Sequence, residues 1–370
     1  MARPVTVRRV ELRDFRNYER AQLDLAAGVT VISGPNGAGK TNLLEAIYFG
    51  LTGRSCRTSN EREMVRHGGS VTRVALETED EAGAHLLEAG FEPGETKRLR
   101  VDGALVERLA DSTARPLVSV FMPERLELVR GAPSTRRAHL DQLVIALWPG
   151  RAPTRASYSR ALAQRNALLA RVRAGIVAAE LLDPWDAELA RHGAQLMSDR
   201  EQAVVAIAES FAARARELGL PQSAEVTYRR RSRATDGEGL RAELEARRAT
   251  DLARGFSGHG PHRDDLALSH DGRPLRAFGS QGQQRVALLA LLLAERDALA
   301  EIDRSPLMLL DDVMSELDSE RRERLGALLG EGGQAVVTAT DAERVPVSSL
   351  GALVGVWAGV VGADATELLA

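Results

Sequence analysis

A glycine-rich stretch near the N-terminus limits the folds open to this 370-residue chain more than any other feature. Residues 34–41 read GPNGAGKT, which satisfies the spacing G-x-x-x-x-G-K-[ST] of a phosphate-binding loop. A β-branched run precedes the loop at residues 28–33, and apolar residues at helical spacing follow it at residues 43–51. A glycine turn that arose by chance would not require a strand before it and a helix after it. Strand, loop and helix in this order indicate an α/β fold built around a nucleotide.

Each part of the loop has a predicted role. Its glycines let backbone amides turn toward an anion, and the following helix adds its positive end. Lys40 is expected to reach the β- and γ-phosphates of ATP, and the Thr41 hydroxyl to help hold Mg²⁺. Lysine occurs elsewhere only at Lys97, in a chain that otherwise uses arginine, so Lys40 stands out as a compact point charge. The predicted nucleotide-binding set is Gly34, Pro35, Asn36, Gly37, Ala38, Gly39, Lys40, Thr41 and Asn42.

Two carboxylates end an apolar run at residues 307–312, LMLLDD. A buried strand that stops at Asp311 places this side chain at the sheet edge where ligands collect. Asp311 is therefore predicted to be a Mg²⁺ partner, and Asp312 the catalytic residue that orients or deprotonates water.

A second candidate anion site is the turn GSQGQQR at residues 279–285, which precedes a long apolar helix. Two interpretations of Ser280 remain open from the residues alone. The serine and glycines at a helix N-terminus can bind an anion. Alternatively, Ser280 is an ordinary helix cap with Gln283 at the capping-box position.

The remaining pattern predicts how the chain is organised. Residues 71–102 read as an antiparallel meander, and residues 154–218 as two long amphipathic helices that are broken near Pro184. We expect an ATPase head made of residues 1–149 and 256–370, with a helical second lobe at residues 150–255.

Composition excludes several classes of protein. The net charge of −3 gives no overall basic field, so a nucleic-acid site must be a local patch. The single cysteine, Cys56, permits no intramolecular disulfide and favours a reducing cytoplasm. The uncharged run at residues 345–363 contains proline and glycines and is predicted to be a buried strand, so no membrane partner is expected.

These motifs together resemble the ABC-type ATPases, and within them the DNA-repair branch with SMC-like heads. The order of phosphate loop, distant S-x-G-Q turn, acid-ended strand and SELD segment is similar to that of the family. The stretches that carry the resemblance are LRDFRNY (12–18), GPNGAGKTNLLEAI (34–47), GRSCRT (53–58), FMPERLELVRGAPSTRRAHLD (121–141), GPHRDDL (260–266), SQGQQR (280–285) and LLDDVMSELD (309–318).

The resemblance implies a P-loop ABC-type head with an added antiparallel β layer and a helical second lobe. It implies that ATP drives head-to-head dimerisation on DNA, with Ser280 acting in trans on the γ-phosphate held by the other subunit. It further implies slow, DNA-dependent hydrolysis that times release. The expected process is recombinational gap repair and replication restart, with RecR and indirectly RecO helping to place RecA on gapped DNA at single-strand/duplex junctions.

Departures from the transporter pattern favour slow hydrolysis. The second acid is Asp312 in place of glutamate, the signature is GSQGQ, and no switch histidine follows the strand that ends at residues 336–341. Gln142 is a weak candidate for the metal-sensing glutamine. The alternatives are an SMC/Rad50-like DNA-clamping ATPase, which needs long helical arms, a transporter ATPase, and a phosphate-loop kinase.

Local arginine clusters are the candidate DNA contacts, although arginine richness also fits ordinary solvated faces. The preferred candidates are Arg54, Arg57, Arg136 and Arg137. His259 and His262 flank a Gly-Pro pair and are interpreted as loop structure in preference to metal ligands.

Overall fold

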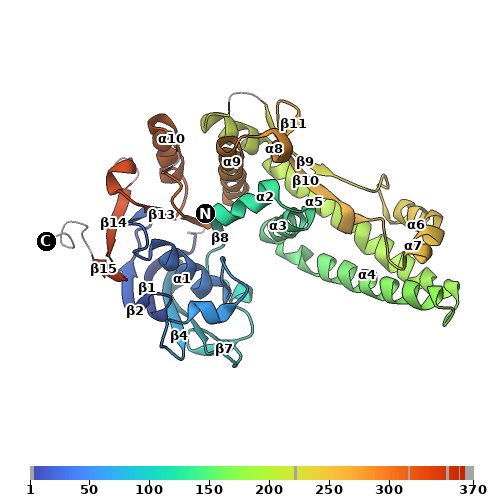
Figure 1. Ribbon diagram of the computed structural model, residues 1–370, viewed down its shortest axis with the longest axis horizontal. Coiled ribbons are helices and arrows are strands. Elements are labelled where there is room, and N and C mark those ends of the chain that lie inside the picture. The colour runs from blue at the N-terminus through green and yellow to red at the C-terminus, as the bar shows by residue number, and fades with distance from the viewer. Residues whose placement is uncertain (1–3, 221–222, 316, 347–349, 358, 363–370) are drawn as a thin grey trace. The chain divides into compact units, whose positions relative to one another are not determined.

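The computed structural model describes residues 4–362 apart from 221–222, 316, 347–349 and 358. The chain forms two compact units (Figure 1). Unit 1 comprises Met1–Arg125, Glu217–Gly219 and Leu299–Ala370, and unit 2 comprises Leu126–Arg216 and Leu220–Ala298. No helix among the described residues is long and apolar enough to cross a membrane.

Unit 1 contains a mostly parallel sheet in the order β15-β14-β3-β13-β12-β8. The strands from β14 to β8 pair in parallel, and β15 adds an antiparallel edge. The five residues of β3 and the five of β13 are all buried, as expected for central strands covered on both faces. Their bounds are β3 (Val29–Ser33), β8 (Val118–Phe121), β12 (Leu307–Leu310), β13 (Ala335–Ala339), β14 (Leu350–Trp357) and β15 (Val360–Gly362).

A second sheet of unit 1 is antiparallel, in the order β2-β1-β4-β5-β6-β7. It contains the predicted meander and confirms the added β layer. Helix α1 (Lys40–Thr52) contacts strands of both sheets and fills the space between them, and α10 (Ser319–Gly330) joins β12 to β13. The strands are β1 (Thr6–Phe15), β2 (Tyr18–Asp24), β4 (Thr72–Asp80), β5 (Gly83–Phe91), β6 (Arg98–Val101) and β7 (Ala104–Val106).

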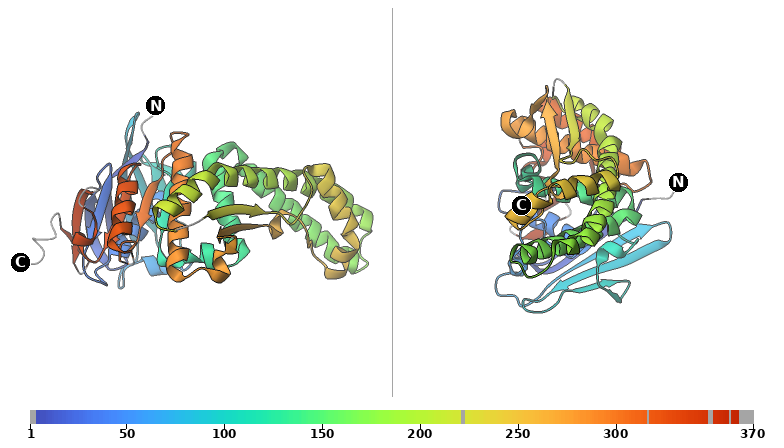
Figure 2. Two further views of the ribbon diagram at one scale, coloured as in Figure 1. Left: turned by 90° about the horizontal axis from the view of Figure 1, so that it is seen from above. Right: turned by 90° about the vertical axis from the view of Figure 1, so that its right-hand side faces the viewer.

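Unit 2 is mainly helical and contains the predicted helical pair, α4 (Ala152–Arg173) and α5 (Asp183–Glu217). The two helices run antiparallel (Figure 2) and share a core that includes Tyr158, Leu189 and Leu196. Its short sheet has the order β11-β10-β9. The other elements are α2 (Glu127–Arg130), α3 (Pro133–Leu147), β9 (Ala224–Arg229), α6 (Gly237–Ala246), α7 (Arg248–Arg254), β10 (Asp265–His270), β11 (Arg273–Pro274), α8 (Leu275–Phe278) and α9 (Gln281–Ala300).

The observed units differ from the predicted lobes at both boundaries. Residues 126–149 and 256–298 pack with unit 2, although the sequence pattern assigned them to the head. The reason is tertiary: α3 packs on β10, and Arg136 on α3 pairs with Asp265 on β10 at 2.8 Å. His139 on α3 also bonds Glu295 on α9 at 2.6 Å. These long-range pairs leave no trace in local periodicity.

Candidate nucleotide-binding site

The phosphate loop connects β3 to α1 at the carboxyl edge of the parallel sheet, as predicted. Gly39 has φ 115°, and a Cβ there would lie 2.6 Å from both Asn17 Nδ2 and the Tyr18 hydroxyl. A Cβ on Gly34 would lie 2.1 Å from the Val356 carbonyl oxygen. Both positions therefore require glycine, because atoms of the β1–β2 hairpin or of β14 occupy the space.

Lys40 lies within the loop that it is predicted to serve. Its Nζ donates to the carbonyl oxygens of Gly34 at 2.7 Å and Pro35 at 3.0 Å, and the residue is only 7% exposed. Burial lowers the pKa of Lys40, while Asp312 and Asp311 act in the opposite direction. Lys40 is therefore a compact cation at the loop, placed to neutralise the negative charge of a polyphosphate bound there.

Thr41 and Asp311 come together as the predicted Mg²⁺ pair. The Thr41 hydroxyl lies 3.0 and 2.9 Å from the two carboxylate oxygens of Asp311, although the residues are 270 positions apart. Burial raises the pKa of Asp311, and hydrogen bonds from Thr338 and Thr41 oppose this shift. Hydroxyl and carboxylate oxygens are the ligands that Mg²⁺ prefers, so these residues fit the ion.

Asp312, the predicted water-orienting residue, is held next to Asp311 with one carboxylate oxygen unpartnered within the described part of the chain. Its backbone adopts φ 46°, in the left-handed region, and its amide donates to Thr338 Oγ1 at 2.8 Å. The Ser315 hydroxyl donates to Oδ2 at 2.9 Å, whereas Oδ1 is buried with no partner among the described residues. A buried carboxylate oxygen without a donor is costly, and such positions are typical of functional sites.

Thr338 is a site residue that the sequence analysis missed. It lies on β13, donates to Asp311 Oδ1 at 2.7 Å and accepts from the Asp312 amide, so it holds both acids. The available signal was a polar residue at the end of an apolar strand, VVTA, at the same sheet edge.

Asn42 and Arg57 contact one another beside the loop. Asn42 Nδ2 donates to Asn17 Oδ1 at 2.7 Å, and Arg57 donates to Asn42 Oδ1 at 2.9 Å. Arg57 also lies 3.4 Å from the buried carboxylate of Glu45. Asn42, predicted to bind nucleotide, therefore has both side-chain groups engaged by protein. Arg54 is exposed.

Two of the predicted residues in unit 2 are held by the protein itself. Arg136 is 4% exposed and forms a two-point pair with Asp265, so it is removed from the DNA candidates. Arg137 donates to the Asp264 carbonyl at 2.7 Å. Gln142 is exposed on α3.

Ser280 forms a complete capping box at the start of α9. Its hydroxyl accepts from the Gln283 amide at 3.2 Å, and the Gln283 side chain accepts from the Ser280 amide at 2.8 Å. The cap interpretation of this turn is therefore confirmed. A cap leaves the hydroxyl proton available, so the anion interpretation stays a prediction.

The two histidines of the HGPH segment, residues 259–262, serve loop structure, as predicted. His259 bonds Glu243 at 2.5 Å, and His262 lies between the Tyr158 hydroxyl at 2.7 Å and the Ser257 carbonyl at 2.9 Å. The described residues contain no cluster of three or more side chains suited to a metal.

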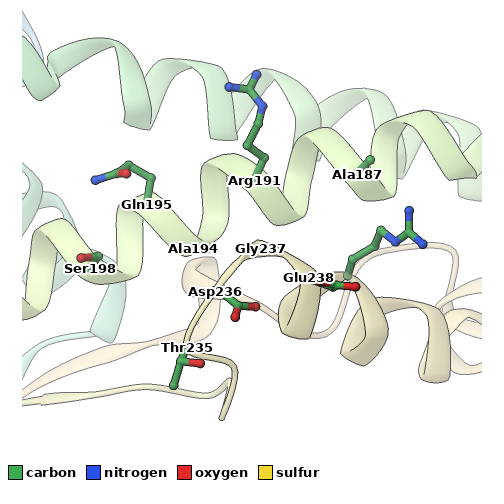
Figure 3. A pocket seen from close by; sticks show the side chains of 10 residues that line it. Ala187, Arg191, Ala194, Gln195, Ser198, Thr235, Asp236, Gly237 and Glu238 are labelled. Atoms are coloured by element: carbon green, nitrogen blue, oxygen red, sulfur yellow. The ribbon is translucent and has the colours of Figure 1, made fainter.

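A separate cavity of about 590 Å³ lies in unit 2 between α5 and the segment before α6 (Figure 3). Arg191 lines one side, with Asp236 and Glu238 opposite. Asp236 caps α6 by accepting from the Gly239 amide at 2.8 Å. The lining includes none of the residues predicted to bind nucleotide.

A phosphate loop, a strand-end acid pair and an antiparallel β layer on one parallel sheet define an ATPase head of the ABC and SMC type. The sequence matches the family described as RecF/RecN/SMC N terminal domain over residues 6–358. It is 39% identical to the DNA replication and repair protein RecF of Frankia alni, with 95% of this chain and 98% of that protein aligned. The chain belongs to the RecF family of DNA replication and repair proteins.

Solved structures agree with this assignment. The structure of the recombination mediator protein RecF with ATP superposes with a TM-score of 0.85 at 28% identity, covering 98% of each chain. An Smc head domain with an extended coiled coil from Pyrococcus furiosus has a TM-score of 0.61 at 18% identity, covering 99% of this chain and 98% of that one. The second likeness concerns the fold alone.

Proposed function

We propose that this protein is an ATP-dependent DNA-binding clamp, in which ATP joins two heads on DNA and slow hydrolysis releases them. The observation that carries the proposal is the Thr41–Asp311 contact beside the unpartnered Asp312 Oδ1. In this proposal, Thr41 and Asp311 would hold the metal and Asp312 would supply the base, all in one cluster at the end of the phosphate loop.

ATP with Mg²⁺ is the cofactor that these residues fit. The loop from Gly34 to Thr41 would cradle the phosphates, Lys40 would neutralise them, and Thr41 with Asp311 would hold the ion. Bound Mg²⁺ would supply charge stabilisation at the phosphates. The relative whose structure is described with ATP supports this choice.

Asp312 is proposed to act on the attacking water. Its Oδ1 has no donor among the described residues, while Ser315 and Thr338 fix the rest of the residue. Aspartate reaches one methylene less than glutamate, so we expect weak, DNA-dependent hydrolysis that acts as a timer.

Ser280 is proposed to complete the site of the opposite subunit. It belongs to unit 2, whereas Lys40, Thr41 and Asp311 belong to unit 1. The start of α9 offers backbone amides and a positive helix end to an anion. A homodimer whose two sites each draw on both subunits would form only with ATP bound.

The proposed partners follow from the family. The relatives are recombination mediators of the RecFOR pathway. We infer that this protein acts with RecR, and indirectly RecO, to help place RecA on gapped DNA. Arg54 and Arg57 remain proposed DNA contacts, and Arg137 a weaker one, because its guanidinium already binds a carbonyl.

An SMC/Rad50-like structural clamp is the alternative function. Such proteins need long arms, and here the longest described helices have 22 and 35 residues. A 35-residue helix spans roughly 50 Å, which makes a short hairpin and not an extended rod.

Light scattering with and without ATP tests the clamp directly. The parent protein should double in mass with ATP. Ser280→Arg should stay monomeric while each subunit still binds ATP, because a large cation at the turn blocks close approach. Ser159→Arg, the same change at an exposed position of α4, is the matched control and should still dimerise. An ATP-dependent dimer of Ser280→Arg would leave Ser280 as a helix cap only.

A further inference from the structure

Four arginines form one row across the outer face of the antiparallel sheet. Arg13 on β1 lies directly opposite Arg20 on β2 and opposite Arg73 on β4. Arg73 in turn lies opposite Gly90 on β5, and Gly90 opposite Arg98 on β6. Residues directly opposite on paired strands share a face, so all four side chains point the same way. Arg13, Arg20, Arg73 and Arg98, here called the arginine row, are all exposed.

The arginine row is not neutralised within the described residues, because none of its four guanidinium groups has a hydrogen bond or ion pair there. Two other arginines of the same sheet are paired, Arg8 with Glu79 and Arg9 with Asp24, whereas Arg100 on β6 has no ion pair among the described residues. Like charges directly opposite one another destabilise a sheet. Unpaired arginines that lie directly opposite one another therefore point to an anionic ligand.

The arginine row lies in a groove of about 420 Å³ on this face. The only aromatic residue of its lining is Phe91, which is 8% exposed and cannot stack on a base. Binding of single strands depends on exposed aromatic side chains, whereas duplex binding rests on phosphate contacts. Glutamates also line the groove beside the row, so the DNA backbone should follow the arginine row itself; they are Glu11, Glu88, Glu92 and Glu95.

We propose that the arginine row binds the phosphodiester backbone of duplex DNA. Strands lie about 4.8 Å apart, so four strand intervals from Arg20 to Arg98 span roughly 19 Å. This length allows contact with several consecutive phosphates, and each guanidinium can bind one phosphate with two donors. The inference rests on the proposed function, because it names the surface through which the clamp holds DNA.

The hairpin that carries the row also touches the nucleotide site. Arg13 and Arg20 flank the β1–β2 turn, and Asn17 in that turn donates to the Ala38 carbonyl of the phosphate loop at 3.1 Å. Asn17 also accepts from Asn42. The β1–β2 turn therefore connects the proposed duplex-binding surface directly to the phosphate loop.

The test is a salt titration of binding to a fluorescein-labelled blunt duplex of random sequence, with ATP present. The double variant Arg13→Gln/Arg73→Gln removes two contacts and should lower the log–log salt slope by about 1.8. With this change of slope, the double variant should bind roughly 60-fold more weakly than the parent at 0.1 M salt, and the two affinities should be almost equal at 1 M. Arg9→Gln, a paired arginine on the same strand, should change little. ATP affinity should match the parent in all variants, and the melting temperature of the double variant should not fall, because it removes like charges that lie opposite one another.

Each outcome separates the inference from the proposed function. A parent protein that binds no duplex refutes the clamp itself. A parent that binds, with a double variant of equal affinity and slope, refutes only the arginine row and assigns it to another anionic partner. An equal loss in Arg9→Gln would show a general charge effect and also overturn the proposal. A larger loss on single-stranded than on duplex DNA would overturn the choice of duplex.

Discussion

Asp312→Asn should convert a timed clamp into a persistent one. The structure indicates that this change is conservative in shape: Asp312 has φ 46°, a conformation that asparagine adopts readily. The remaining amide oxygen can still accept from Ser315. What disappears is the basic oxygen, so the chemical step alone should be affected.

The magnitude follows from the role assigned to this oxygen. General-base catalysis contributes typically about 10²–10⁴-fold. Turnover should therefore fall by about this factor, equivalent to about 2.7–5.4 kcal/mol in the barrier. ATP affinity should change little, because Lys40, Thr41 and Asp311 are untouched. The ATP-bound dimer should then remain longer on DNA.

The assay measures three quantities on each variant: steady-state phosphate release, ATP affinity, and dwell time on duplex DNA. Asp311→Asn is the contrasting variant. It removes a carboxylate oxygen that accepts from Thr41, so Mg²⁺-dependent binding should weaken together with turnover. A shorter dwell time or a dissolved dimer for Asp312→Asn would refute hydrolysis as the release step. Unchanged turnover would refute its role as the base.

Three further outcomes are expected. Lys40→Arg should lose tight ATP binding in fluorescence titration, because a guanidinium cannot replace a buried ammonium held by loop carbonyls. Lys97→Arg is the control and should keep the parent affinity. Equal ATP affinities of the two variants would refute the role of Lys40 in the phosphate loop. Arg165→Met should lower the free energy of unfolding by about 3–5 kcal/mol in urea, since the fully buried guanidinium pairs with two buried aspartates. A loss below about 1 kcal/mol would contradict this reading. Burial lowers the pKa of His262 to about 4, so the unfolded chain takes up the proton first as the pH falls. The contribution of His262 to the free energy of unfolding should therefore be fully present above about pH 6.5 and decrease by at most about 3 kcal/mol toward pH 4. His262→Gln should remove this contribution to the pH dependence of stability.

Local signals in the sequence were sufficient to predict the phosphate loop and most elements near it. The phosphate loop, the strand ending at Asp311 and the meander at residues 71–102 all appear where predicted. Each depends on turn chemistry or side-chain periodicity within about ten residues, which the chain encodes directly. The helical pair is of the same kind, because its apolar faces repeat along the sequence.

Tertiary structure alone decided which arginines are free. Arg136 and Arg13 look alike as members of basic stretches, yet Arg136 is buried against Asp265, 129 positions away, and Arg13 is exposed in the arginine row. The row exists only because strand register brings Arg20, Arg13, Arg73 and Arg98 into line. Burial and strand register are set by contacts between segments that are distant in the sequence. Local sequence patterns therefore cannot predict which guanidinium is paired and which is left exposed.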